Sequence, residues 1–252
     1  DGRRGSHDPA VRALAKRERA DYKRFFGIVN KHLVIYSERS GFYKYYEALI
    51  DGLLKSSNIT IHYITSDPDD AVFELAKTQP RIRPYYIGLK KLIPLMMRLD
   101  ADMVAMTTPD LDTFYIKRSL VRKDAEYIYV PHDMMSIHMG FHKGALDHFD
   151  TVFATGPHVE REIRSTERVY GLPEKTVVPF GYPLAEKLEA AYEHMDKTPH
   201  EKKEILIAPS WQEDNLLDSV IDTLIAKLRA PDVHLTLSLI HISEPTRRRG
   251  IS

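Results

Sequence analysis

Polar side chains suited to ligand binding follow several short apolar runs of this sequence. The candidates for substrate binding are small hydroxyls, a glycine, a histidine and a tryptophan: Ser37, Ser66, Thr108, Gly156, His158, Ser210 and Trp211. Serine and threonine also cap helices, so any one hydroxyl alone is more readily explained as structural. Because ligands of open α/β sheets bind beyond the carboxyl ends of the strands, the set as a whole predicts a cleft at that edge.

His132 is the strongest single candidate for catalysis. It follows the apolar run 127–130 and Pro131, which predicts a place at the rim of a sheet, facing the cleft. A neutral imidazole there can take a proton from an alcohol near pH 7, as a general base does. Asp133, the next residue, is the candidate to orient the ring. The alternative is a structural histidine held by hydrogen bonds.

Further histidines raise the question of a metal site. His138 and His142 are four residues apart, as on one helical face, and His148 follows them. Gly140 and Gly144 interrupt a stable helix there, and no HExxH pattern occurs. We therefore predict no metal site.

Two other features are candidates for holding an anion. The segment 134–143 is predicted to be a glycine-bearing loop over the cleft, where Lys143 meets a phosphate. Gly156 and Pro157 begin a predicted helix whose first N–H groups point outward and suit an anion, although most helix starts bind only a cap.

Short apolar strands alternate with amphipathic helices from Lys31 onward. The predicted strands are 33–36, 59–64, 85–87, 102–107, 126–130, 151–154, 176–179, 204–208 and 233–237. The predicted helices are 42–54, 69–77, 89–99, 157–170, 184–194 and 216–228. This alternation indicates an α/β fold of doubly wound parallel sheets, with helices on both faces.

The same pattern divides the chain into parts. Residues 1–30 are predicted to be a leader, helical in part, of which 1–8 look like tag or linker, and 31–183 a Rossmann-like domain. A connection over 184–203 then leads to the start of a second, truncated domain at 204–236. Residues 237–252 are predicted to be an artefactual tail, because 237–247 (LSLIHISEPTR) resemble a translated sequencing adapter.

Composition and missing motifs exclude several classes of protein. Lys+Arg and Asp+Glu are both 36, so no overall charge draws the chain to nucleic acid. With no cysteine, thiolate chemistry and disulfides are excluded. The absence of GxGxxG, P-loop and GxSxG motifs disfavours dinucleotide oxidoreductases, P-loop NTPases and α/β-hydrolases.

The predicted location is cytoplasmic, since no apolar run reaches the roughly 20 residues that span a bilayer. The basic segment 11–29 leaves two alternatives, a solvated helix or a helix lying on the anionic inner face of the cell membrane.

Taken together, these stretches resemble the CDP-glycerol glycerophosphotransferase family, whose members build teichoic-acid-type polymers on a two-domain GT-B architecture. The segments that carry the resemblance are 35–38, 64–67, 99–112 (LDADMVAMTTPDLD), 147–158, 179–183 and 205–211, which includes APSW. The family's acceptor-side histidine commonly lies in a Trp-His-Gly-Thr context, and His132 matches it by position, within Val130-Pro131-His132-Asp133. Ser210 and Trp211 match the start of a segment near the donor phosphates.

The resemblance implies transfer of glycerol phosphate from CDP-glycerol to a hydroxyl of a lipid-linked polymer, with release of CMP and without a cofactor. It implies a GT-B cleft whose donor wall lies in the second domain, so we expect the present chain alone to be inactive. Two alternatives stay open: a GT-B glycosyltransferase that uses a nucleotide sugar, and a non-catalytic binding protein.

Overall fold

The chain divides into two compact units, with the boundary between Tyr192 and Glu193. The computed structural model describes residues 8–209 and 216–238. The boundary lies inside the stretch 184–203, where the sequence predicts a connection.

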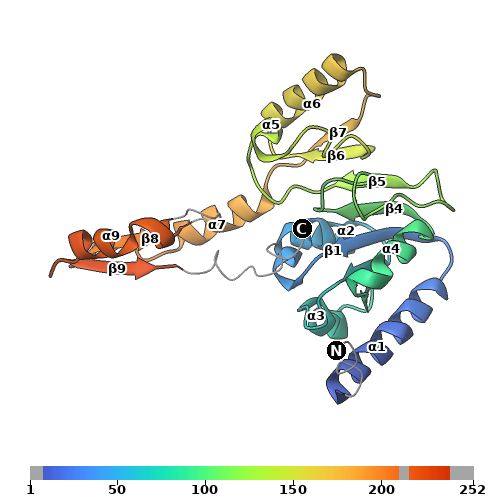
Figure 1. The fold of residues 1–252 in the computed structure, drawn as a ribbon, viewed down its shortest axis with the longest axis horizontal. Helices are drawn as coiled ribbons and strands as arrows, with labels where there is room; N and C mark the ends of the chain where they lie inside the picture. The colour runs from blue at the N-terminus through green and yellow to red at the C-terminus, as the bar shows by residue number, and fades with distance from the viewer. Residues whose placement is uncertain (1–7, 210–215, 239–252) are drawn as a thin grey trace. The chain divides into compact units, whose positions relative to one another are not determined.

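The first unit is built on a sheet of seven parallel strands in the order β3-β2-β1-β4-β5-β6-β7 (Figure 1). The strands are β1 (Lys31–Ser37), β2 (Ile61–Thr65), β3 (Ile82–Tyr86), β4 (Ala101–Met106), β5 (Glu126–Tyr129), β6 (Thr151–Ala154) and β7 (Thr176–Pro179). The chain moves outward from β1 to β3, returns to the other side of β1, and continues to β7. The order therefore reverses between β1 and β4, which is where α/β sheets of this kind bind ligands.

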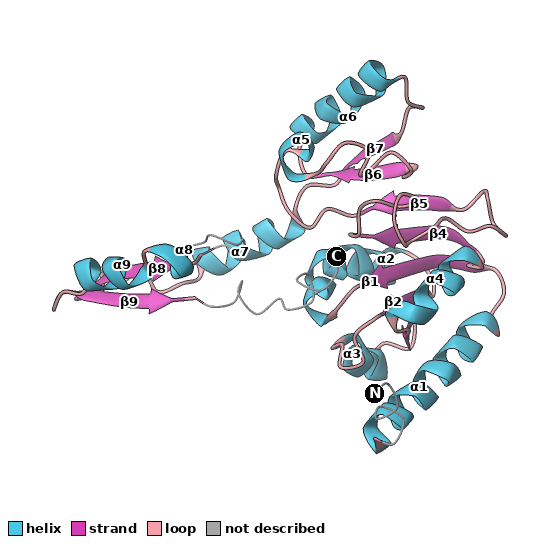
Figure 2. Ribbon diagram, in the orientation of Figure 1, coloured by secondary structure: helices cyan, strands magenta, loops and turns pink. Residues whose placement is uncertain are grey.

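Helices cover both faces of this sheet (Figure 2). The helices up to the boundary between the units are α1 (Pro9–Phe26), the 3-10 helix η2 (Ser40–Phe42), α2 (Tyr43–Ser56), α3 (Val72–Thr78), α4 (Leu89–Met97), α5 (Ile137–Gly140), α6 (Pro157–Tyr170) and α7 (Pro183–Glu193), which has no buried residue. One apolar cluster joins the sheet to α1, α4 and α6, and a second joins its other face to α2 and α3. Both faces of the central strands are thus buried, which explains their nearly continuous apolar sequences.

The prediction of an α/β fold with a doubly wound parallel sheet is confirmed in the first unit. The strands 151–154 and 176–179 and the helix 157–170 have the predicted bounds. The helix α6 ends as its sequence requires, because Gly171 takes a left-handed conformation with φ 62° and donates its N–H to the carbonyl of Glu167.

The helix α1 is part of the sheet domain, although the sequence placed residues 1–30 in a separate leader. Phe25 is fully buried and packs edge-on against Tyr85 at 5.2 Å between ring centroids. The strand β3 is an edge strand, and α1 supplies its missing partners. Asp21 accepts a hydrogen bond from the N–H of Tyr86 at 2.9 Å, and Glu18 accepts one from Gly88 at 2.9 Å.

This packing also bears on the two alternatives for the segment 11–29. Its bulky apolar side chains Phe25, Tyr22 and Phe26 pack against the core of the unit rather than facing outward. The outward side of α1 carries the exposed cations Lys16, Arg19 and Lys23. No helix in the part of the chain that the structure describes is long and apolar enough to cross a membrane.

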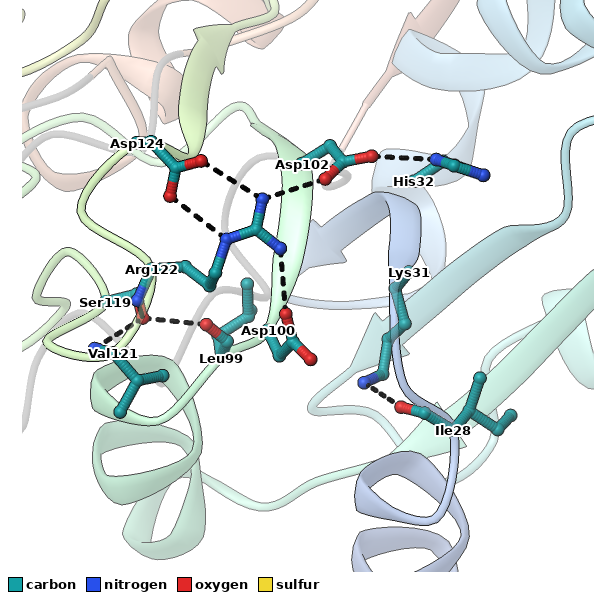
Figure 3. A network of polar contacts seen from close by, with 10 residues as sticks. All are labelled: Ile28, Lys31, His32, Leu99, Asp100, Asp102, Ser119, Val121, Arg122 and Asp124. Atoms are coloured by element: carbon teal, nitrogen blue, oxygen red, sulfur yellow. Dashed lines mark hydrogen bonds and ion pairs between the residues drawn. The ribbon is translucent and has the colours of Figure 1, made fainter.

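At the edge of the sheet where the strands begin, which we call the amino edge, Arg122 binds three aspartates (Figure 3). Its guanidinium donates to Asp100, Asp102 and Asp124 at 2.9, 2.9 and 3.0 Å, and Asp102 also contacts Nδ1 of His32 at 2.7 Å. Hydrogen bonds from Arg122 and His32 lower the pKa of the Asp102 carboxyl. The cluster ties together the amino ends of β1 and β4 and the residues that precede β5.

The second unit contains a parallel pair of strands, β8 (Lys203–Ile207) and β9 (Val233–Leu237), with the helices α8 (Leu216–Ser219) and α9 (Ile221–Leu228) between them in sequence. The sequence predicts one helix over 216–228. The structure breaks it at Val220, a β-branched residue with φ −131° and weak helix preference. Leu237, the first residue of the predicted tail, belongs to β9 and pairs with Ile207 of β8. Residues 239–247 lie outside the described residues.

We expect Asp21→Ala to lower the free energy of unfolding by about 1–3 kcal/mol, because the buried N–H of Tyr86 loses its acceptor. Urea denaturation followed by circular dichroism would measure this. Arg19→Ala, an exposed position on the same helix, is the matched control and should change stability by less than about 0.5 kcal/mol. Equal effects of the two substitutions would show that α1 does not seal the sheet edge.

A second prediction concerns His62 in β2, which is 3% exposed and whose Nδ1 lies 2.9 Å from the hydroxyl of Tyr85. Burial, followed by the nearby cations Lys31 and Arg83, lowers the pKa of His62 to about 4. Between the ordinary histidine pKa of about 6.5 and this value the unfolded chain binds the extra proton, so stability falls as the pH drops through that window.

The measurement is the free energy of unfolding of the wild type and His62→Gln between pH 4 and 7. The variant should lose less stability on acidification, by up to about 3 kcal/mol across the window. His148→Gln, at an exposed histidine, should keep the wild-type slope. A slope that His62→Gln leaves unchanged would mean that this buried ring does not titrate as described.

Candidate functional site

Because all seven strands are parallel, the carboxyl ends of the strands lie at one edge of the sheet. At the switch between β1 and β4, the hydroxyl of Thr108 donates to Glu38 at 2.9 Å. The buried hydroxyl of Tyr46 accepts from the N–H of Thr107 at 2.9 Å and donates to the carbonyl of Tyr36 at 2.7 Å. Tyr46 therefore fixes the two strand ends against each other.

A cavity of about 120 Å³ adjoins Thr108 at this switch point. Its other walls come from the loop after β4 and include Asp110, Phe114 and Tyr115. Asp110 holds φ 65°, a left-handed conformation that is uncommon outside glycine and that aspartate and asparagine adopt more readily than most residues. The predicted binding residue Thr108 thus borders a recess in the surface.

The predicted binding residues Ser37 and Ser66 lie close to Thr108 but serve the strand ends. Ser37 is fully buried and donates to the carbonyl of Arg39 at 2.9 Å. Ser66 donates to the carbonyl of Ile87 at 2.9 Å and lies 3.3 Å from the hydroxyl of Tyr36. In this arrangement both hydroxyls donate to backbone carbonyls of the loops after the strands, and only Ser66 retains partial exposure.

His132 lies directly after β5, at the same edge, as the sequence predicts. Its ring is surrounded by aromatic side chains, with centroid distances of 6.1 Å to Tyr45, 6.4 Å to Tyr129 and 6.0 Å to Phe141. The backbone carbonyl of His132 accepts a hydrogen bond from the hydroxyl of Tyr182 at 3.0 Å. The side chain is 28% exposed, so the ring is held in place while part of it stays accessible.

Tyr129 fixes the ring of His132 through a hydrogen bond of 2.9 Å between its hydroxyl and Nδ1. Tyr129 is buried, and burial followed by the charge of Asp133 raises the pKa of its hydroxyl well above the usual value. The hydroxyl is therefore neutral near pH 7. When it accepts the Nδ1–H of a neutral imidazole, it holds the ring in the tautomer whose basic nitrogen is Nε2.

Asp133 lies on the Nε2 side of the ring, with 3.5 Å between Nε2 and Oδ2. Its other oxygen accepts a hydrogen bond from the N–H of Met135 at 3.1 Å, which orients the carboxylate. The distance to Nε2 is long for a hydrogen bond but short enough for Coulomb attraction to a protonated ring. Asp133 is thus placed to stabilise an imidazolium, and Tyr129, rather than Asp133, orients the neutral ring.

The aromatic residues around His132 are the part of the site that sequence reasoning missed. Tyr129 is the last residue of a buried strand, and such a position alone indicates a core residue. The signal that could have identified its role is the histidine three residues later. Tyr45 on α2 and Phe141 after α5 reach His132 only through the tertiary fold. A small cavity of about 20 Å³, roughly one water in size, lies between Tyr129, Asp133 and Thr155.

Gly156 and His158 lie at the same edge, after β6. Gly156 is the N-cap of α6, and no side chain caps this end of the helix with a hydrogen bond. A Cβ atom at Gly156 would come within 3.0 Å of Nδ1 of His158, so the two residues touch. Pro157 has no N–H, and the N–H of Val159 donates to the carbonyl of Gly156 at 3.1 Å. The anion site expected at this helix start stays a prediction.

Lys143 lies elsewhere. Its ammonium is 3.9 Å from the ring centroid of Tyr170, the last residue of α6. The helix α6 has 14 residues and is therefore roughly 21 Å long, so Lys143 is close to the end opposite Gly156. The segment 134–143, predicted as a loop over the cleft, contains the short helix α5 and runs beside α6, as the contact of the His138 N–H with Glu162 at 3.1 Å shows.

The other histidines of this segment have separate partners. Nε2 of His142 forms an ion pair with Asp110 at 2.6 Å, and Nε2 of His138 lies 2.9 Å from the hydroxyl of Thr166. The carbonyl of Lys143 and the carboxylate of Asp110 raise the pKa of His142. Among the described residues, no group of three or more histidines and acids is arranged to hold a metal ion. Ser210 and Trp211 lie outside the described residues.

No protein-family model and no curated protein matches the sequence. Two solved structures of the wall teichoic acid polymerase TagF, from crystals soaked with CDPG, are similar to the chain, with TM-scores of 0.47 and 0.48 and 14% sequence identity. The matches cover 90% and 95% of this chain but 61% and 66% of the polymerase chains. This chain therefore spans less than two thirds of their length, and likeness at this level assigns no role to any residue.

We expect Tyr129→Phe to change which ring nitrogen of His132 carries the proton, because Nδ1 loses its hydrogen bond to the hydroxyl oxygen of Tyr129. The ¹⁵N chemical shifts of the imidazole nitrogens in this chain would report it, with the Nε2–H form gaining population in the variant. The loss of stability should be about 1 kcal/mol. Tyr127→Phe is the control, since Tyr127 is on the same strand but bonds to Ser119. Unchanged His132 shifts in Tyr129→Phe would rule out the positioning role.

Proposed function

We propose that the complete protein transfers glycerol phosphate from CDP-glycerol to a hydroxyl of a lipid-linked, teichoic-acid-type polymer and releases CMP. In this proposal the first unit binds the acceptor, and His132 is the general base. The observation that carries it is the setting of His132, a partly exposed imidazole held at the carboxyl edge of a doubly wound sheet by a buried, neutral tyrosine.

The sequence segments that resemble the glycerophosphotransferase family support the proposal by their places in the fold. Segment 99–112 forms β4 and the loop at the switch point, and 147–158 forms β6 and the start of α6. Segment 179–183 follows β7 and carries Tyr182, which bonds to His132. Three stretches that are far apart in sequence therefore end at the same edge of the sheet as His132.

The proposed reaction uses the arrangement of the ring as follows. Nε2 of His132 takes the proton of an acceptor hydroxyl while that oxygen attacks the β-phosphorus of CDP-glycerol. The bond from this phosphorus to the bridging oxygen breaks, and CMP leaves with the electron pair. The imidazolium that forms is stabilised by the carboxylate of Asp133, 3.5 Å from Nε2.

The donor and the membrane belong to the same proposal. Ser210 and Trp211 and further groups of the second domain would hold the pyrophosphate, and Thr108 and the N-terminus of α6 would contact substrate at the edge of the first unit. The exposed cations of α1, Lys16, Arg19 and Lys23, are the groups that would face anionic lipid at the inner face of a membrane.

The test is CMP release from CDP-glycerol by the complete natural protein that contains this chain, in the presence of a polymer acceptor. His132→Gln should lower kcat/KM by about 10²–10⁴-fold, the usual contribution of a general base. His148→Gln, at an exposed histidine in the same unit, should keep the wild-type value. A His132→Gln protein with undiminished turnover would mean that the histidine is structural.

Replacing the donor distinguishes the proposal from its alternatives. Turnover with a UDP-sugar but not with CDP-glycerol or CDP-ribitol would identify a glycosyltransferase instead. Binding of CDP-glycerol without turnover by the complete protein would identify a binding protein. Either result would overturn the proposed reaction.

A further inference from the structure

A second cavity lies between the connection from α5 to β6 and the outer half of α6, in the part of the first unit where Lys143 is found. Its volume is about 360 Å³, within the range of small-molecule sites. It is larger than the recess of about 120 Å³ at the switch point. Neither His132 nor any other residue of its aromatic surroundings except Phe141 lines it.

The floor of this cavity is apolar. Leu146 and Ile163 are buried there at 6% and 5% exposure, and Phe141 and Leu172 add partly buried apolar surface. Val169 lies at the mouth and is 66% exposed. A ligand that fills the cavity would therefore bury an apolar body.

Two ammonium groups line the same cavity, and each has N–H donors that are not all taken by acceptors among the described residues. Lys143 lies over the ring of Tyr170, and among the described residues no carboxylate pairs with it. Lys175 is 9% exposed, and two of its three ammonium donors bond to the carbonyls of Asp147 and Phe149 at 2.7 and 3.0 Å. No third acceptor for Lys175 is found in residues 8–209 or 216–238.

The acidic groups of the cavity compensate this charge only in part. Both oxygens of Glu167 are engaged, by Arg164 at 3.0 and 2.8 Å and by the N–H of Lys175 at 2.7 Å. The charge of a protonated His142 is balanced by Asp110. Asp147 is the one remaining carboxylate on the lining described, against two ammonium groups. The space left for a ligand is therefore positive by one charge.

We propose that this cavity binds an amphipathic anion, with a single carboxylate or phosphate head on a short aliphatic body. The body lies on Leu146, Ile163 and Leu172, and the head accepts hydrogen bonds from Lys143 and from the third donor of Lys175. An ammonium group without a paired carboxylate in a partly apolar recess is stabilised most by an anion, because charge-assisted hydrogen bonds are stronger than neutral ones. The phosphate contact predicted for Lys143 thus belongs to this cavity rather than to the cleft at His132.

The site is independent of the proposed transferase reaction. Lys143 and His132 lie toward opposite ends of α6, which is roughly 21 Å long. The ligand is therefore expected to bind to this chain as it stands, whether or not the complete protein uses CDP-glycerol.

The test is titration calorimetry of this chain with octanoate, octyl phosphate, octanol and octylamine. Octanoate or octyl phosphate, or both, should bind at least 10-fold more tightly than octanol, and octylamine should not bind. The stronger of the two acids identifies the head group. Equal affinity for octanol, or binding by none of the probes, would overturn the proposal.

Substitutions locate the binding. Lys143→Gln should weaken octanoate or octyl phosphate about 10-fold, and Val169→Trp, which fills the mouth, should abolish binding. Lys123→Gln, an exposed lysine of the same unit outside the cavity, and His132→Gln should both leave it unchanged. Lys143 is exposed, so its substitution does not threaten folding. Wild-type affinity in Lys143→Gln would place the anion elsewhere.

Discussion

Parallel pairing of β1 with both β2 and β4 is the constraint from which the rest of the first unit follows. It places every strand end that carries a polar residue at one edge, and it requires helices on both faces because crossovers between parallel strands must pass over the sheet. The two edges then have different tasks. The amino edge is closed by Arg122 and its aspartates, and the carboxyl edge is left for the candidate site. Arg122 and Asp102 are only partly buried, with side chains 26% and 44% exposed, so their ion pair adds little stability, and apolar burial in the two core clusters supplies most of the stabilisation.

The setting of His132 shows how burial and access are balanced. A histidine that is to exchange a proton near neutral pH must keep contact with solvent, whereas a ring that must present one nitrogen in one direction must be packed. Tyr129 meets both needs, because its burial favours the neutral hydroxyl and that hydroxyl fixes Nδ1, while the side chain of His132 stays 28% exposed. Tyr182 adds a second anchor on the backbone carbonyl, from a segment fifty residues later. Both tyrosines are therefore positioning residues in the proposed reaction.

The sequence predicted the strands and most of the helices in their order, because each carries its own local signal; the exceptions are α5, in a segment predicted as a loop, and 216–228, which forms two helices. The buried strand before His132 and the cap residues of α6 are examples, and both were located correctly from spacing alone. What the sequence could not predict are contacts made across the fold. The docking of α1 on β3 depends on Asp21 and Glu18 meeting backbone N–H groups more than sixty residues away. The place of Lys143 depends on where the connection after α5 runs, and glycines at 140 and 144 indicate only that this connection is not one long helix.

Lys143 lies away from His132, toward the far end of α6. Arg39 follows β1 directly and lies 4.8 Å over the ring of Phe42, which makes it the nearest guanidinium in sequence to the switch point. Phosphoryl transfer depends mainly on neutralising the charge of the transferred group. Lys44, 5.1 Å from the ring centroid of Tyr45, is a further cation beside the aromatic residues around His132. In the proposed reaction, groups of the second domain would supply positive potential around the donor, as the family resemblance implies. In the same proposal, the first unit contributes the proton acceptor and the surface that binds the acceptor hydroxyl.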